Sequence, residues 1–336
     1  MEIDIILNEF ATVAESAELA ELAESYGLRA VWSSSYHDRR DPFMTLILAA
    51  DRTSDIRLGP LAICAKELHP LKIGNALHTL NETSNGRAMV CVGGGGGVIQ
   101  GIGMTRDHMI GDLKECLEIL TGITTDTPLN YDGKYYKTWN YCLNWATDPK
   151  PQIYVASNHP QTMQLAVKYA DGLMTSDFCV PLMERFVGKI NAALDEAGRP
   201  RDSFRINNFW AWHIKEDAEA SWKEARLELI LRGYLGEQYF DPFLTPEEVK
   251  FMREHFQDFL DAWIAKTGVI ANVPDELVTK MIENISFVGG LDAIDGAIEV
   301  LHQFAAAGLT EIALRVHEDP ADAIRLIGER VAPALR

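Results

Sequence analysis

The chain has 336 residues, of which 47% are hydrophobic and 24% charged, a composition typical of a globular protein with one large domain or two ordinary ones. Its formal net charge of −18 repels nucleic acid and anionic membranes, so neither is an expected partner. No run approaches about eighteen apolar residues and the acidic start lacks the basic segment of a secretory signal, so we expect a cytoplasmic protein that does not span a membrane.

Strand-like and helix-like stretches alternate along the chain. In chain order the expected strands are IDIIL, RAVWSS, IRLGPLAIC, RAMVCVG, PQIYVAS, GLMTS, FRINNFWAWHI and LTEIALRV, each followed by a helical pattern, from ESAELAELAESYG to PADAIRLIGERVAPAL. Strands that are apolar throughout indicate a parallel sheet covered on both sides by helices. Eight such units in about 300 residues favour a (β/α)8 TIM barrel over an open doubly wound sheet.

Two stretches interrupt this alternation, which otherwise predicts a single domain over residues 1–336. Residues 123–150 form an aromatic loop excursion after the fourth unit, and residues 234–288 form a mostly helical insertion before the last unit. In a barrel, additions at the carboxyl ends of strands build or cover the active site.

The cysteines and histidines give no sign of a metal site. The five cysteines are an odd number without C-x-x-C spacing, which indicates reduced thiols, and the nine histidines form no H-x-x-x-H pair.

Five consecutive glycines at 93–97 follow the fourth expected strand. A dinucleotide-binding glycine motif belongs after the first strand, so this match is weak. A simple turn is a second interpretation. The third is a barrel loop where bare backbone N–H groups approach a flat ring or a phosphate.

Several motifs resemble one known superfamily when their order is considered. They are AVWSSSYHDRRDPF, HPLKIGNALHTLNETSNGRAMVCVGGG, YDGKYY and PQIYVASNHPQTMQLAVKYADGLMTS. Together they resemble the bacterial-luciferase-like flavin oxidoreductases. The resemblance is strongest to the branch that uses the deazaflavin coenzyme F-420, which includes methylenetetrahydromethanopterin reductase and a glucose-6-phosphate dehydrogenase.

The resemblance implies a cofactor ring at the carboxyl-terminal mouth of the barrel. It also implies a non-prolyl cis peptide bond near Pro60, Leu61 and Ala62, and a phosphate-binding turn in which two family glycines are replaced by Asn158 and His159. The expected cofactor-binding residues are Ser35, Pro60, Leu61, Ala62, Cys64, Gly93, Gly94, Gly95, Gly96, Ala156, Ser157, Asn158 and His159. For Cys64, a buried packing role is the alternative.

Two acid–base positions depart from the family pattern. The Asp–His pair after the second strand reads Ser35 and Tyr36, and a glutamate after the strand-four glycines is replaced by Gly96, so we do not expect this chain to oxidise a sugar hydroxyl by those groups. Glu9 is the best remaining carboxylate. Tyr36 and His37 are candidate hydrogen-bond donors near the ring. For Glu9, a salt bridge that closes the barrel mouth is the alternative, and for His37 it is a solvated side chain.

Three tryptophans are candidates for the substrate wall. Trp210 and Trp212 alternate along one expected strand and therefore share a face. If that face points inward they stack on cofactor or substrate; otherwise they pack in the core. Trp139 lies in the aromatic excursion, where packing alone is equally consistent.

The resemblance implies hydride transfer between reduced coenzyme F-420 and a small organic substrate. An FMN-dependent monooxygenase is the alternative, and a non-catalytic flavin-binding barrel is a weaker one. It also implies a homodimer.

Overall fold

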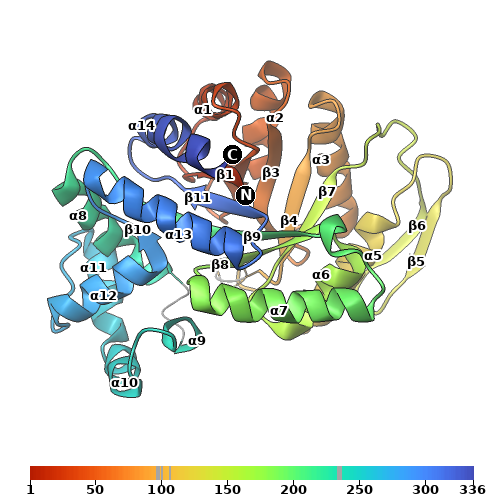
Figure 1. Cartoon of the computed structure of the whole chain (residues 1–336). Helices are drawn as coiled ribbons and strands as arrows, with labels where there is room; N and C mark the ends of the chain where they lie inside the picture. Colours follow the sequence, from red (N-terminus) through yellow and green to blue (C-terminus); the bar gives the residue numbers. More distant parts are fainter. Residues whose placement is uncertain (96–98, 100, 106, 233–236) are drawn as a thin grey trace.

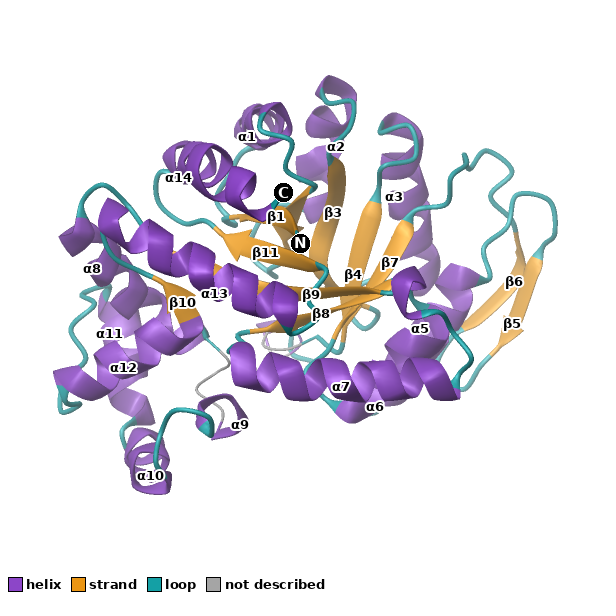
Figure 2. Cartoon of the chain, in the orientation of Figure 1, coloured by secondary structure: helices purple, strands orange, loops and turns teal. Residues whose placement is uncertain are grey.

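The protein is a closed barrel of parallel strands surrounded by helices, in a computed structural model that describes residues 1–95, 99, 101–105, 107–232 and 237–336 (Figures 1 and 2). The barrel strands are β1 (Glu2–Leu7), β2 (Ala30–Ser34), β3 (Arg57–Cys64), β4 (Met89–Gly93), β7 (Gln152–Ala156), β8 (Gly172–Ser176), β9 (Arg205–Trp212) and β11 (Glu311–Arg315). Each pairs in parallel with its neighbours, and pairing of β8 with β9 closes the ring. The predicted (β/α)8 barrel is confirmed.

Helices cover the outside of the barrel. They are α1 (Val13–Ser25), α2 (Pro42–Arg52), α3 (Pro70–Thr83), α5 (Met109–Thr121), α6 (Pro160–Tyr169), α7 (Val180–Glu196), α8 (Ala218–Glu228), α13 (Ile294–Ala306) and α14 (Pro320–Leu326). Local sequence explains several of their starts: Thr12 and Glu15 form a capping box at α1, and α2, α3, α6 and α7 each carry proline in the first turn. Among the described helices, none has the length and apolar character needed to cross a bilayer.

The described part of the stretch 234–288, from residue 237 onward, contains four α-helices and a short strand. These are α9 (Glu237–Phe240), α10 (Pro246–Glu254), α11 (Phe256–Ala265), α12 (Asp275–Ile285) and β10 (Ser286–Phe287), which pairs with the end of β9. In Figure 1 they form a lobe beside the barrel, below α8.

Residues 123–150 contain an antiparallel hairpin, β5 (Leu129–Asp132) and β6 (Lys137–Tyr141). Its turn is held against α5 because the Glu115 carboxylate accepts three backbone N–H bonds from residues 134, 135 and 136, at 2.8–2.9 Å. Tyr136 thereby reaches His69 before α3, with the rings edge to face at 5.3 Å.

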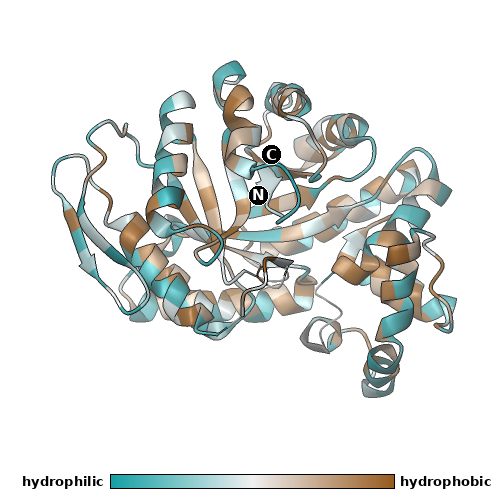
Figure 3. Ribbon diagram, turned by 180° about the vertical axis from the view of Figure 1, so that it is seen from behind, coloured by the Kyte–Doolittle hydropathy of each residue, from teal (hydrophilic) through white to brown (hydrophobic). Residues whose placement is uncertain are grey.

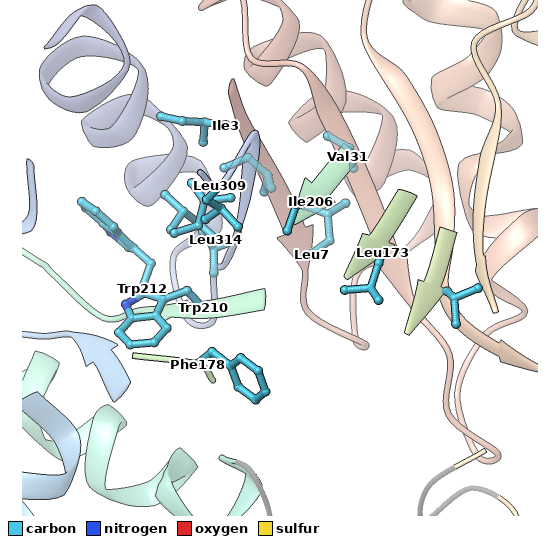
Figure 4. Close-up of a cluster of buried hydrophobic side chains, with 14 of the residues drawn as sticks. Ile3, Leu7, Val31, Leu173, Phe178, Ile206, Trp210, Trp212, Leu309 and Leu314 are labelled. Atoms are coloured by element: carbon cyan, nitrogen blue, oxygen red, sulfur yellow. The ribbon is translucent and has the colours of Figure 1, made fainter. Parts of the chain in front are cut away.

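The apolar core has two layers. The larger one lies between the strands and the helices, and Figure 4 shows part of it around Leu7, Val31, Leu173 and Leu314. The smaller one fills the inside of the barrel and consists of Ile6, Ala30, Trp32, Met89, Cys91, Tyr154, Met174 and Ala313. In Figure 3 most helices show both hydrophilic and hydrophobic residues, as expected for helices with one face on this core.

A buried charge network closes the amino-terminal end of the barrel. Asp4 accepts hydrogen bonds from Arg29 Nε at 2.7 Å, Trp32 Nε1 at 2.8 Å and Asn207 Nδ2 at 2.8 Å. Glu311 lies 3.0 Å from Arg29 Nη1 and accepts from Asn207 at 3.1 Å. Charges buried this deeply are tolerated only when paired and hydrogen-bonded, so this end is a structural plug.

Candidate active site at the barrel mouth

The floor of the barrel mouth is made of small and apolar groups. Leu61, Ala62, Ala156 and Phe209 are half-buried and pack on the inner core from above. A Cβ atom added to Gly93 would lie 3.2 Å from the Cβ of Ala156 and 3.6 Å from that of Ala62, so the ends of β3, β4 and β7 meet here. Such a floor leaves room for a flat ring to rest on it.

A non-prolyl cis peptide bond joins Leu61 and Ala62. It lies within the three residues where the sequence predicted it. The register of β3 against β4 shifts between Leu61 and Ile63, and the N–H of Ser35 donates to the carbonyl of Leu61 at 2.9 Å. The end of β2 is thereby attached beside the cis bond.

The described part of the glycine run turns the chain over this floor. Gly95 has φ +92°, and a Cβ there would come within 2.3 Å of Ile99 Cγ1 and 2.6 Å of Cys64 Sγ, so only glycine fits without movement. A Cβ at Gly94 would meet Met109 at 3.4 Å. Gly96 lies outside the described residues.

Two expected cofactor residues do not reach the open floor. Cys64 is 3% exposed, its Sγ lies beneath Gly95, and burial raises the pKa of its thiol. Pro60 is buried as well. The structure therefore corrects both expectations toward packing roles.

The turn between β7 and α6 provides a helix amino terminus at the mouth. Ser157 is buried and its hydroxyl bonds Thr162 Oγ1 and the carbonyl of His159, whereas the side chain of His159 is exposed and makes no cap bond. Asn158 accepts from the N–H of Ser176 at 3.0 Å and donates to the hydroxyl of Tyr239. Helix amino termini with hydroxyl groups are typical phosphate sites, but the Asn158 amide is already engaged.

The candidate acid–base residues lie around the rim. Glu9 forms an ion pair with Arg315, so the salt-bridge alternative matches the geometry. Tyr36 is 37% exposed, and His37 is exposed against Gly101, where an added Cβ would come within 2.7 Å of its ring.

The substrate predictions for the three tryptophans are wrong. Trp210 and Trp212 are 2% and 1% exposed and point away from the barrel interior into the helix-facing core, where Trp210 packs edge to face on Phe304 at 5.2 Å (Figure 4). Asn207 and Phe209 are the neighbours that point inward, because alternate residues of a strand face opposite sides. Trp139 is 86% exposed on the hairpin, next to buried Thr138, and lines no wall.

Buried charged residues at the mouth escaped the sequence analysis. Arg315 donates to Ser34 Oγ at 2.5 Å, and Arg232 lies 3.2 Å from Asp177 with its guanidinium 4.7 Å above the Phe209 ring. His317 stacks on His213 at 4.7 Å, and burial lowers the pKa of both imidazoles. The available signal was Arg315 itself, a charge that follows the apolar run Ile312–Leu314 at the end of an expected strand.

Glu67 was missed as well. It follows β3, and its Oε1 accepts a hydrogen bond from Ser35 Oγ at 3.1 Å. Its Oε2 is buried and has no hydrogen-bond partner among the described residues. Burial raises the pKa of this carboxyl, an effect that the Ser35 hydrogen bond partly offsets.

A cavity of about 520 Å³ lies next to the segment that follows β3. Its lining is Ala65, Lys66, His69, Gly103, Met104, Thr105 and Tyr136. The mouth therefore combines an apolar floor, a glycine turn at Gly94–Gly95 and the partly buried carboxyl of Glu67. This combination suits a flat cofactor with an anionic tail.

Known proteins share this architecture. The sequence profile of the luciferase-like monooxygenases matches residues 4–311. A 5,10-methylenetetrahydromethanopterin reductase from Archaeoglobus fulgidus is 27% identical over 323 residues, covering 94% of each chain.

Two solved structures show the same fold. The coenzyme F-420-dependent tetrahydromethanopterin reductase of Methanopyrus kandleri superposes with a TM-score of 0.82 at 21% identity, over 100% of this chain and 99% of that one. The oxygenating constituent of 3,6-diketocamphane monooxygenase of Pseudomonas putida, solved with FMN, superposes with a TM-score of 0.67 at 20% identity, over 99% and 98%. With the family profile spanning nearly the whole barrel, the chain belongs to the luciferase-like monooxygenase family.

Proposed function

We propose that this protein transfers a hydride between reduced deazaflavin coenzyme F-420 and a small organic substrate bound at the barrel mouth. The observation that supports this most is the floor formed by Leu61, Ala62, Gly93 and Ala156 beside the cis peptide bond. The Methanopyrus kandleri reductase that shares this fold is named as coenzyme F-420-dependent, which supports the deazaflavin as the cofactor.

The residues present fit such a cofactor. The floor and Gly94–Gly95 would lie under its ring, and the α6 amino terminus with Ser157 and Thr162 would hold an anionic tail, which a surface of net charge −18 would otherwise repel. When bound, the deazaflavin supplies hydride transfer at its C5 position. Phe209, which packs on the inner core at the mouth, would help to exclude water from that position.

An FMN-dependent monooxygenase is the second candidate, since the Pseudomonas putida oxygenase solved with FMN shares the fold. Both cofactors present a similar flat ring, so the floor alone does not separate them.

Ligand binding separates the two candidates. Fluorescence titration of the purified protein with coenzyme F-420 and with FMN should give micromolar or tighter binding of the first and weaker binding of the second. Reduced FMN should support no oxygen uptake above the protein-free rate. Tight FMN binding with oxygen uptake would transfer the proposal to the monooxygenase, and binding of neither ligand would end both.

A homodimer and a cytoplasmic location stay predictions. Light scattering on a size-exclusion column tests the first, with two copies per particle expected.

A further inference from the structure

Glu67 and Ser35 come from the ends of neighbouring strands and meet beside the cis peptide bond. Ser35 is attached to the Leu61 carbonyl through its N–H and to Glu67 Oε1 through its hydroxyl. The two contacts fix the carboxyl at the edge of the floor proposed for the ring. Its second oxygen, Oε2, is withdrawn from water and without a hydrogen-bond partner in the described chain.

Few charges lie near Glu67. Asp41, at the start of α2, opposes ionisation of Glu67, and Cys64 is a buried thiol at the end of β3. Lys66 is adjacent in sequence, but its ammonium group turns to Asp107 and Asp112, 3.2 and 3.1 Å away. Among the described residues, no cation is paired with the Glu67 carboxylate, and a buried carboxyl without such a partner favours its protonated form.

We propose that Glu67 is an acid–base residue of this mouth, holding a proton on Oε2 for the substrate atom that becomes negative as the substrate accepts a hydride. The inference rests on the proposed function. The substrate C=X bond gains a hydride from the reduced cofactor at carbon, its electron pair moves to X, and X takes the proton from Oε2. Glu67 is left as a carboxylate that still accepts the Ser35 hydrogen bond, and the reverse direction returns the proton.

The role differs from simple packing in one respect. The pKa of a carboxyl that only packs is unchanged when the mouth fills, whereas the pKa of a carboxyl beside the ligand responds to the desolvation of the whole mouth. The anionic tail of the coenzyme adds a like charge, and both effects raise the pKa of Glu67.

The test is an infrared titration of carboxyl groups in the whole protein. Subtracting the spectra of Glu67→Gln from wild type isolates the Glu67 band, and the exposed Glu216→Gln provides the matched control. We expect the Glu67 band to titrate above the ordinary range of a glutamate, and Ser35→Ala to raise that midpoint further because it removes a hydrogen bond to the charged form. Saturating oxidised coenzyme F-420 should raise the wild-type midpoint as well.

Each outcome decides something. A Glu67 band that titrates in the ordinary range of a glutamate, or that is unmoved by Ser35→Ala, overturns the proton-holding role. A midpoint unmoved by bound coenzyme overturns contact with the site while leaving the proposed function intact. A wild-type protein that binds no coenzyme at all ends the proposed function, and the donor role with it.

Discussion

At the closed end of the barrel, the charged groups of Asp4, Arg29 and Glu311 are deeply buried and paired with one another, and in their immediate network only Asn207 Oδ1 has no hydrogen-bond partner among the described residues. At the mouth, Glu67 Oε2, Arg232 Nε and His317 Nε2 are also withdrawn from water, but they have no hydrogen-bond partner among the described residues. Leaving a buried polar group unpaired costs stability, so natural proteins retain such groups mainly where function uses them. The paired charges at the closed end therefore fit a structural role, and the unpaired groups at the mouth fit the ligand-binding role that we propose for it.

The largest effect is expected for Asp4→Asn, which tests the structural role of the buried charges at the closed end. Removing one member of a buried charge network leaves Arg29 undercompensated, and we expect the free energy of unfolding to fall by about 3–5 kcal/mol. Urea denaturation measures it, and coenzyme affinity should be unchanged at temperatures where the variant is folded. The exposed Asp195–Arg201 pair is the control, because solvent screens it and Asp195→Asn should leave the free energy of unfolding nearly unchanged. Equal effects of the two variants would contradict a structural role for the plug.

Glu67→Gln should have the opposite effect to Asp4→Asn: turnover should fall while stability is nearly unchanged. The amide keeps the shape and the Ser35 contact but has no acidic proton, so we expect turnover to fall by roughly 100-fold or more while stability changes little. Consumption of reduced coenzyme F-420 is followed with acetone and with methylenetetrahydromethanopterin as probe acceptors. Coenzyme affinity is measured in parallel, and wild-type turnover by the variant would rule out the donor role.

Gly95→Ala tests the glycine turn at the mouth. The added Cβ meets Ile99 and Cys64 and adopts a positive φ, so we expect a loss of roughly 2–3 kcal/mol in unfolding free energy together with weaker coenzyme binding. Gly198→Ala is a matched control, because Gly198, just after α7, also has a positive φ, +64°, with nothing within 4 Å of its added Cβ. It should cost only about 1–2 kcal/mol and leave binding intact. Equal losses would show that the contacts at Gly95 are unimportant.

The stacked histidines should give the mouth a pH dependence. In the native state burial lowers the pKa of His317 well below its ordinary value, whereas in the unfolded chain the imidazole takes up a proton below about pH 6.5. Protons therefore favour the unfolded state, and stability should fall with pH below about 6.5, by up to about 1.4 kcal/mol per pH unit for each such histidine.

Comparing His317→Gln with wild type isolates that effect. The variant should lose part of the slope between pH 7 and pH 5 in urea denaturation, and the exposed His302→Gln should not. A slope that survives in His317→Gln would assign the effect to other groups.

Local sequence patterns determined much of this protein. Cofactor binding by Ser35, Ala62, Gly93 and Ala156 stays a prediction. The strands, the helices and the closed barrel were predicted from the residues themselves, and the position of the cis bond was implied by the family resemblance. These features depend on hydrophobic periodicity and on motifs whose residues are near one another in the chain. Such patterns can be recognised in the sequence without knowledge of the tertiary fold.

Tertiary structure alone decided which faces point inward and which distant groups meet. A strand buried on both sides is apolar throughout, so the pattern of β9 could not show that Asn207 and Phe209, rather than Trp210 and Trp212, face the barrel interior. Glu67 meets Ser35 across 32 positions, and Arg315 meets Glu9 across 306, only because adjacent parallel strands end at the same rim. Burial of a charge, and hence its pKa, depends on those long-range neighbours and not on the residues beside it in sequence.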